Sequence, residues 1–169
     1  SATRNYAAAI DALNSLQSNS ATIEAIRRSG KTVNELNEPE MTEYLQRIGH
    51  RRDELDRLNV IHITGTKGKG STAAFCDALL QKARPPGAGK IGLYTSPHMV
   101  AARERIRIDG VPISEADFAK FFWEVWDRLE QNPHRALETT PLRPVYFRFM
   151  TILAFHVFIS LEVSATLLA

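Results

Sequence analysis

Residues 65–72 combine glycine, lysine and hydroxyl side chains in an order that suits the binding of a polyphosphate. Glycine lets the backbone approach an anion closely, so that successive N–H groups can donate to its oxygen atoms. Lys69 is placed to reach the β- and γ-phosphates of a nucleotide, and a hydroxyl from Ser71 or Thr72 is placed for a phosphate or a metal ion. The sequence therefore predicts a nucleotide-phosphate loop that consists of Gly65, Thr66, Lys67, Gly68, Lys69, Gly70, Ser71 and Thr72.

The loop lies between a predicted strand and a predicted helix. Residues 58–64 are apolar and β-branched, and they have the length of a buried strand. Residues 71–82 are predicted to be helical, with an inward-facing stripe of Phe75, Ala78 and Leu79. The start of this helix adds the positive end of its dipole to the loop. A second strand is predicted over residues 90–95, so the segment forms a βαβ unit with parallel strands and a right-handed crossover.

The loop departs from the Walker A pattern at two positions. Thr64 stands where that pattern has a glycine, and Gly70 separates Lys69 from Ser71. A glycine-rich turn after a strand often does no more than cap a helix, but the strand–loop–helix context favours phosphate binding.

A second segment of interest follows the strand predicted over residues 90–95. Ser96 lies just beyond its carboxyl end, where ligands collect in open α/β sheets, and a hydroxyl is a hard oxygen ligand of the kind that Mg²⁺ binds. Taken alone, Ser96 and Pro97 are more simply interpreted as a Ser-Pro turn before a solvated basic strand. His98 is equally open, because a loop histidine is usually only solvated.

The residues before position 58 predict helices. The apolar positions with helical spacing are Tyr6, Ile10, Leu13 and Leu16, then Ile23 and Ile26, and then Met41, Leu45, Ile48 and Leu55. Thr32 with Glu35 is a candidate capping box, and Gly49 weakens the last of these helices. We therefore predict a helical amino-terminal segment over residues 1–57.

Strands and helices alternate in the rest of the chain. Residues 106–108, before Asp109 and Gly110, predict an edge strand or a hairpin arm. Ser114 and Asp117 predict the capped start of a helix whose core positions are Phe118, Phe121, Phe122, Val125, Trp126 and Leu129. A helix from Pro144 to about residue 161 is apolar on most sides, and residues 163–168 predict another sheet strand.

Composition excludes several classes of function. The chain of 169 residues has 21 Lys and Arg against 19 Asp and Glu, a net charge of +2, which is too even for a protein that wraps nucleic acid or lies on anionic lipid. The apolar run at residues 149–161 is shorter than the about 20 residues that span a bilayer. Cys76 is the single cysteine, so no internal disulfide and no cysteine-based zinc site can form, and a reducing compartment is expected.

The two segments together resemble the folylpolyglutamate synthase family, part of the Mur-ligase-like group of ATP-dependent amide ligases. The resemblance rests on residues 60–71 and on Ser96, Pro97 and His98 followed by residues 103–110. Residues 121–123 and 146–149 look like the eukaryotic members, as does the lysine at position 67. A P-loop kinase or motor would leave the second segment as a coincidence.

The resemblance implies an α/β fold: a P-loop-type, Mur-ligase-like central sheet with flanking helices, occupying residues 58–169. It implies that Gly68, Lys69, Gly70 and Ser71 hold ATP, with Lys69 as the catalytic cation. It also implies that Ser96 is a ligand of Mg²⁺. The loop from Ser96 to Arg105 would border the folate, and its substrate-side residues would be Pro97, His98, Arg103 and Arg105.

The family's reaction is the ATP-dependent activation of a folate's terminal carboxylate as an acyl phosphate, which then joins the amine of L-glutamate. The implied substrates are tetrahydrofolate and L-glutamate, with no nucleic acid or membrane partner, and the full-length protein is expected to be a cytoplasmic or mitochondrial monomer. Dihydrofolate synthase activity and a non-catalytic nucleotide-binding fragment remain the alternatives.

The strand predicted over residues 163–168 is followed by a single residue. In the resembling family this strand leads into a glutamate that binds metal, and a second domain comes later. We therefore expect a fragment whose sheet is incomplete at its C-terminal side, whose C-terminal domain is absent, and which is inactive when isolated.

Overall fold

The computed structural model describes residues 3–17, 33–135 and 140–169. The chain divides into two compact units. The helical unit comprises residues 1–51 and 119–153, and the sheet unit comprises residues 52–118 and 154–169. The short helix predicted around Ile23 and Ile26 and the candidate cap at Thr32 lie outside the described residues. The domain boundary predicted after residue 57 stays a prediction.

The helical unit contains α1 (Tyr6–Ser15) and α3 (Val33–Arg47), most of α6 (Glu115–Gln131) and the first half of α7 (Tyr146–Ser160). The Asn5 side chain caps α1 by accepting a 2.9 Å hydrogen bond from the amide of Ala8, and Leu13 is fully buried on the predicted face. The chain leaves α3 through Gly49, whose φ of +91° is a left-handed conformation that favours glycine.

The start of α6 confirms the cap predicted from Ser114 and Asp117. The Ser114 hydroxyl accepts a 3.0 Å hydrogen bond from the amide of Asp117, and the two side chains bond to each other at 2.6 Å. Every predicted apolar position of α6 is buried except Trp126, which is partly exposed. The rings of Phe122 and Trp126 stack at 5.5 Å between centroids, and Phe122 also meets Phe149 of α7 at 5.0 Å.

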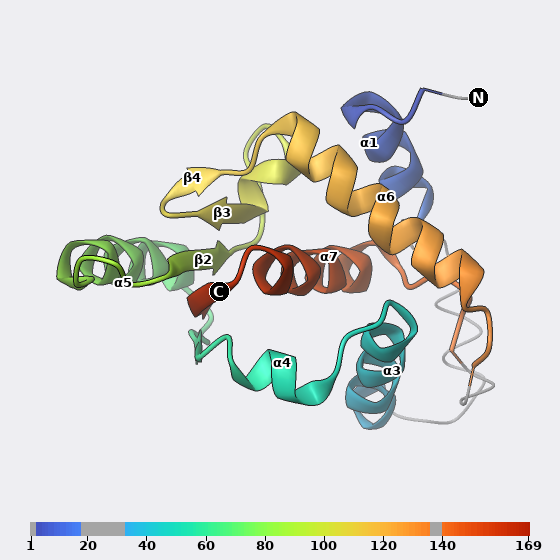
Figure 1. Cartoon of the computed structure of the whole chain (residues 1–169), viewed down its shortest axis with the longest axis horizontal. Coiled ribbons are helices and arrows are strands. Elements are labelled where there is room, and N and C mark those ends of the chain that lie inside the picture. The colour runs from blue at the N-terminus through green and yellow to red at the C-terminus, as the bar shows by residue number, and fades with distance from the viewer. Residues whose placement is uncertain (1–2, 18–32, 136–139) are drawn as a thin grey trace. The chain divides into compact units, whose positions relative to one another are not determined.

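The sheet unit contains five strands in the order β1-β5-β2-β3-β4. Figure 1 labels β2, β3 and β4, which lie side by side in this order. Their bounds are β1 (Val60–His62), β2 (Lys90–Tyr94), β3 (Ile106–Ile108), β4 (Val111–Pro112) and β5 (Val163–Leu168). The last strand, β5, lies between β1 and β2 and is parallel to both, whereas the β2–β3 and β3–β4 pairs are antiparallel. The strand prediction for residues 163–168 and the parallel arrangement are confirmed, while β1 is shorter than predicted.

Residues 106–112 form a hairpin, as one of the two predictions for this segment stated. Asp109 and Gly110 both have positive φ, +50° and +79°, which matches the tight turn that joins twisted antiparallel strands. The Asp109 carboxylate accepts hydrogen bonds from the Arg84 guanidinium at 2.6 Å and from the amide of Ile91 at 3.0 Å. The turn is therefore attached both to β2 and to the end of the preceding helix.

That helix, α5 (Lys69–Ala83), packs on the sheet through a face other than the predicted one. Phe75 and Leu79 are 72% and 66% exposed and Ala78 is exposed, so the prediction that these three face the core is wrong. Ala73, Cys76 and Leu80 pack against Leu93 and Leu167 instead. Both sets have helical spacing, so the apolar pattern alone does not select between them.

Two short helices complete the sheet unit, α4 (Arg52–Asp56) and η1 (Ala102–Arg105). Among the residues that the structure describes, none of the helices is long and apolar enough to cross a membrane.

Candidate functional site

The three parallel strands of the sheet unit end at the same level. Leu168, near the end of β5, pairs with His62 on one side and with Tyr94 on the other. The amide of Ile63 donates to the Leu168 carbonyl at 2.8 Å, and the amide of Ala169 donates to the Tyr94 carbonyl at 2.9 Å. The segments that follow β1 and β2 therefore leave one sheet edge, two strand spacings apart, or about 10 Å. This edge carries the two segments that the sequence analysis singled out.

The first segment is the predicted phosphate loop, and it runs directly into α5. Gly65 and Gly68 have φ values of +151° and +77°, so residues with a side chain would be strained at both positions. Helix α5 begins at Lys69, and the Gly68 carbonyl accepts its first helical bond from the amide of Thr72 at 2.9 Å. The amides of the first turn have no acceptor within the helix, and that turn holds no acidic residue. The arrangement provides N–H donors and a positive dipole end for an anion.

The Lys69 ammonium lies over this loop. Its Nζ atom donates a 2.7 Å hydrogen bond to the Gly65 carbonyl, four residues earlier. The side chain therefore closes the loop and holds its positive charge where the first-turn amides begin. The remaining loop residues, Thr66, Lys67, Gly70, Ser71 and Thr72, are exposed, so the predicted binding residues come together in an accessible segment.

The second segment begins at Ser96, which is exposed beyond the end of β2 together with Pro97. His98 is half-buried, and its Nδ1 accepts a 2.8 Å hydrogen bond from Nε of Arg105. Arg105 is only 5% exposed, and Arg103 donates to the Ile113 carbonyl at 3.1 Å. These two arginines therefore brace the segment internally, and their predicted role on the substrate side stays a prediction.

Sequence reasoning missed Glu104, whose carboxylate accepts hydrogen bonds from three consecutive backbone amides of this segment. These bonds lower the pKa of the Glu104 carboxyl below its ordinary value, with the Met99 amide as the largest contributor. No periodicity or motif marks such a role. The available signal was an acidic residue between two arginines in a loop, which is usually a solvated surface pattern.

Sequence reasoning also missed a buried acid on α5. Asp77 is 7% exposed and accepts a 2.8 Å hydrogen bond at Oδ2 from Nε2 of Gln81, while its Oδ1 has no hydrogen-bond partner among the residues that the structure describes. Burial raises the pKa of the Asp77 carboxyl. The burial of Asp77 could be recognised only once it was known that the face of α5 with Phe75 is exposed and the opposite face is packed.

The residues of this edge do not form a metal cage of their own. Within the described ranges, no group of three or more His, Cys, Asp and Glu side chains could hold a metal ion. Mg²⁺ in nucleotide sites is commonly held by phosphate oxygens together with one or two protein oxygens. The exposed Ser96 hydroxyl fits that arrangement, in which the metal arrives with the phosphates.

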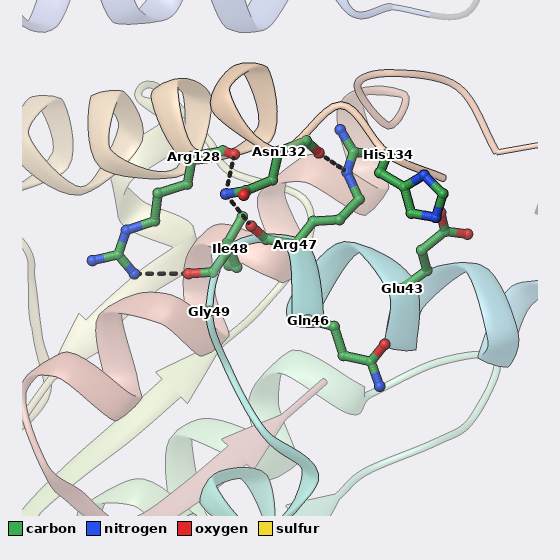
Figure 2. Close-up of a pocket in the computed structure, with 8 residues that line it drawn as sticks. All are labelled: Glu43, Gln46, Arg47, Ile48, Gly49, Arg128, Asn132 and His134. Carbon is green, nitrogen blue, oxygen red and sulfur yellow. Dashed lines mark hydrogen bonds between the residues drawn. The ribbon is translucent and has the colours of Figure 1, made fainter. Parts of the chain in front are cut away.

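A cavity of about 560 Å³ lies elsewhere, in the helical unit, between the ends of α3 and α6 (Figure 2). Arg47, at the end of α3, donates to the carbonyls of Leu129 and Asn132 at the end of α6, and Arg128 of α6 donates to the Ile48 carbonyl after α3, each at 2.8 Å. The arginines therefore cap each other's helices. None of the predicted site residues lines this cavity, whose lining is Glu43, Gln46, Arg47, Ile48, Gly49, Arg128, Asn132 and His134.

Comparison with known sequences identifies close relatives. No family model matches the chain. It is 49% identical over 164 residues to the folylpolyglutamate synthase of Candida albicans, an alignment that covers 92% of this chain and 31% of that protein. It is 50% identical over 161 residues to the folylpolyglutamate synthase of Saccharomyces cerevisiae (strain YJM789), covering 92% of this chain and 29% of that protein. The chain thus spans about 30% of the length of the curated relatives it matches.

Solved structures agree with these relatives. Mycobacterium tuberculosis folylpolyglutamate synthase complexed with ADP superposes with a TM-score of 0.65 at 28% identity, covering 77% of this chain and 27% of that one. A structure described as an FPGS–AMPPCP–folate complex gives a TM-score of 0.67 at 25% identity, with 96% and 34% of the two chains covered. Over 92% of its length the chain is similar to folylpolyglutamate synthases, and its α/β fold matches that of their solved structures.

Proposed function

We propose that the chain supplies the nucleotide-phosphate loop of an ATP-dependent ligase that adds L-glutamate to the terminal carboxylate of tetrahydrofolate. The observation that carries the proposal is the common end of β1, β5 and β2 at Leu168, which brings the 65–72 loop and the Ser96 segment to one edge. The ADP and the AMPPCP with folate in the names of two structural neighbours support this choice of ligands.

The chemistry requires an activated carboxylate. A carboxylate is a poor electrophile and its oxygen is a poor leaving group, and ATP supplies the phosphoryl group that changes both. In the proposed site the first-turn amides of α5 would orient the phosphates, and the Lys69 ammonium would offset the negative charge that develops on the transferring group. Ser96 would supply one hydroxyl oxygen to the accompanying Mg²⁺.

Nucleotide binding by the 169-residue chain tests the proposal directly. ATP affinity would be measured by calorimetry for the unaltered chain, for Lys69→Ala, and for Lys82→Ala, which removes a lysine from the exposed last turn of the same helix. We expect Lys69→Ala to weaken ATP binding about tenfold or more, because a charge-assisted contact to phosphate is lost. Lys82→Ala should bind as the unaltered chain does. Equal affinity for all three would show that the loop is misassigned.

The metal assignment has its own experiment. Ser96→Ala should reduce the extent to which Mg²⁺ strengthens ATP binding, and an unchanged metal dependence would count against Ser96 as a ligand. Because the chain spans about 30% of its relatives' length, we expect no ligated product from the chain alone with ATP, tetrahydrofolate and L-glutamate. Formation of that product would contradict the expectation.

A further inference from the structure

Glu104 occupies an unusual place in the segment that follows β2. One of its carboxylate oxygens accepts from the amide of Met99 at 3.0 Å, and the other accepts from Val100 at 3.3 Å and from Ala101 at 2.8 Å. Three consecutive N–H groups therefore converge on one charged side chain. Hydrogen bonds to an ionised acceptor are stronger than neutral ones, so the group restrains the backbone more than a turn of water-bonded amides would.

An ordinary helix cap does not account for this arrangement. Glu104 is in the short helix η1, which begins after Ala101, so a capping role requires only the bond to the Ala101 amide. The bonds to Met99 and Val100 reach residues that lie before the cap. The carboxylate therefore organises the preceding loop in addition to the helix.

The loop is also attached on its other side. Nε of Arg105 donates to His98 at 2.8 Å, and the Arg105 carbonyl accepts from the amide of Thr95 at 3.0 Å. Residues 98–101 are thus held from both Glu104 and Arg105, and the side chains of Met99 and Val100 project outward with 91% and 88% exposure. Two exposed apolar side chains on a restrained backbone make a rim of defined shape in the segment that follows β2.

We propose that Glu104 is a positioning residue: its ionised carboxylate holds the amides of residues 99–101 and thereby fixes the loop that shapes the substrate side of the site. The substrate part of this inference rests on the proposed function, because it takes a folate as the molecule that meets this rim. The restraint itself rests only on the hydrogen bonds.

The test uses the 169-residue chain and three variants. Glu104→Gln keeps the size of the side chain but turns one acceptor oxygen into a donor, and Glu104→Ala removes both acceptors. Glu115→Gln is the matched control, because Glu115 is an exposed glutamate in the first turn of α6. The measurements are amide hydrogen exchange at residues 99–101, the affinities for folate and for ADP, and the melting temperature.

We expect Glu104→Gln to speed exchange at the three amides about tenfold and Glu104→Ala to speed it further. Folate affinity should fall by about the same factor, while ADP affinity and melting temperature stay close to those of the control. Unchanged exchange would overturn the inference, and so would faster exchange with unaltered folate affinity. Equal losses of folate affinity, ADP affinity and melting temperature would show a merely structural residue and would overturn it too.

The failure of the proposed function is separable from the failure of this inference. A chain that binds ADP but not folate retains the phosphate loop and overturns the role of Glu104 on the substrate side. A chain that binds neither removes the proposed function, and the exchange data still decide whether Glu104 holds the loop.

A pH titration of the amide proton shifts adds an independent readout. Because the pKa of Glu104 is lowered, the restraint is present at neutral pH and is lost only as pH falls through that lowered value. The titratable and charged groups around the carboxylate are His98, which also contributes to lowering the pKa of Glu104, and the neighbouring Arg103, Arg105 and Arg107. The three amides should titrate together in the unaltered chain and show no such step in Glu104→Gln; separate titrations would overturn the inference.

Discussion

Replacement of Arg47 by methionine is the sharpest test of how the helical unit is held together. The Arg47 side chain is 7% exposed and donates 2.8 Å hydrogen bonds to the carbonyls of Leu129, Asn132 and Leu142. Methionine keeps an unbranched stem and good helix propensity at the end of α3, so the change removes the guanidinium and little else.

The expected magnitude follows from two opposing effects. Three carbonyl acceptors lose a charged donor, and each buried acceptor left without a partner costs about 1–3 kcal/mol. Against this, burial lowers the pKa of the Arg47 guanidinium, and its Nη1 atom has no hydrogen-bond partner within the described ranges. The folded protein therefore already bears a desolvation penalty that the variant relieves. We therefore expect a net loss of about 2–4 kcal/mol in the free energy of unfolding, below the simple sum.

Urea unfolding followed by tryptophan fluorescence measures this loss where it occurs. The chain's two tryptophans, Trp123 and Trp126, are both on α6 in the helical unit, the helix whose end Arg47 caps. Arg128→Met is the matched comparison, because within the described residues the Arg128 guanidinium donates one hydrogen bond, to the Ile48 carbonyl. This substitution should lower the free energy of unfolding by about 1 kcal/mol.

The reasoning would be refuted if Arg47→Met cost no more than Arg128→Met, or if it stabilised the chain. Either result would mean that water satisfies the three carbonyls in the variant, or that desolvation of the guanidinium outweighs its hydrogen bonds.

Three further substitutions probe the sheet unit. Gly92→Ala places a Cβ 2.9 Å from two ring carbons of Phe158, so we expect the free energy of unfolding to fall by about 1–3 kcal/mol. Urea unfolding followed by circular dichroism measures this loss, and an unchanged midpoint would mean that the ring moves freely. Asp77→Asn should stabilise the chain at neutral pH, because the raised pKa of Asp77 means that its ionised form is disfavoured in the folded state. The gain in stability should vanish in acid, below the ordinary aspartate pKa, where the carboxyl is neutral in both states. A gain that persists there would contradict this cause. Gly70 lies in the first turn of α5, and a Cβ added there would have no neighbour within 4 Å among the described residues, so Gly70→Ala should raise stability by up to about 1 kcal/mol. ATP affinity should fall if a phosphate approaches this backbone closely; unchanged affinity would argue against that approach.

Local sequence determined much of this protein. The cap at Ser114 and the turn at Asp109 and Gly110 depend on residues within a few positions of one another. The cap was predicted, and a hairpin arm was one of the two predictions for the segment before the turn. The strand at residues 163–168 was predicted with its observed bounds because its composition and length distinguish it from a helix. The loop at residues 65–72 and the helix that follows it are also contiguous in sequence, and the helix was predicted here; phosphate binding by the loop stays a prediction.

Long-range packing decided the rest. Insertion of β5 between β1 and β2 joins residues about 70 to 110 positions apart, and it sets the spacing between the loop at residues 65–72 and the Ser96 segment. The packed face of α5 was misjudged because Ala73, Cys76 and Leu80 repeat as regularly as Phe75 and Leu79, so only contact with the sheet selects between the two stripes.

The polar contacts show the same division between sequence and structure. Residue type reveals that Arg47 and Glu104 are charged, but whether a charge is solvated or holds several backbone groups depends on which carbonyls or amides the fold brings within about 3 Å of it. The amino-acid sequence therefore determined which chemical groups are available, and the tertiary structure determined which groups neighbour one another. The physical reason is that a hydrogen bond acts over a few ångströms, whereas the fold brings together residues that are about a hundred positions apart in the chain.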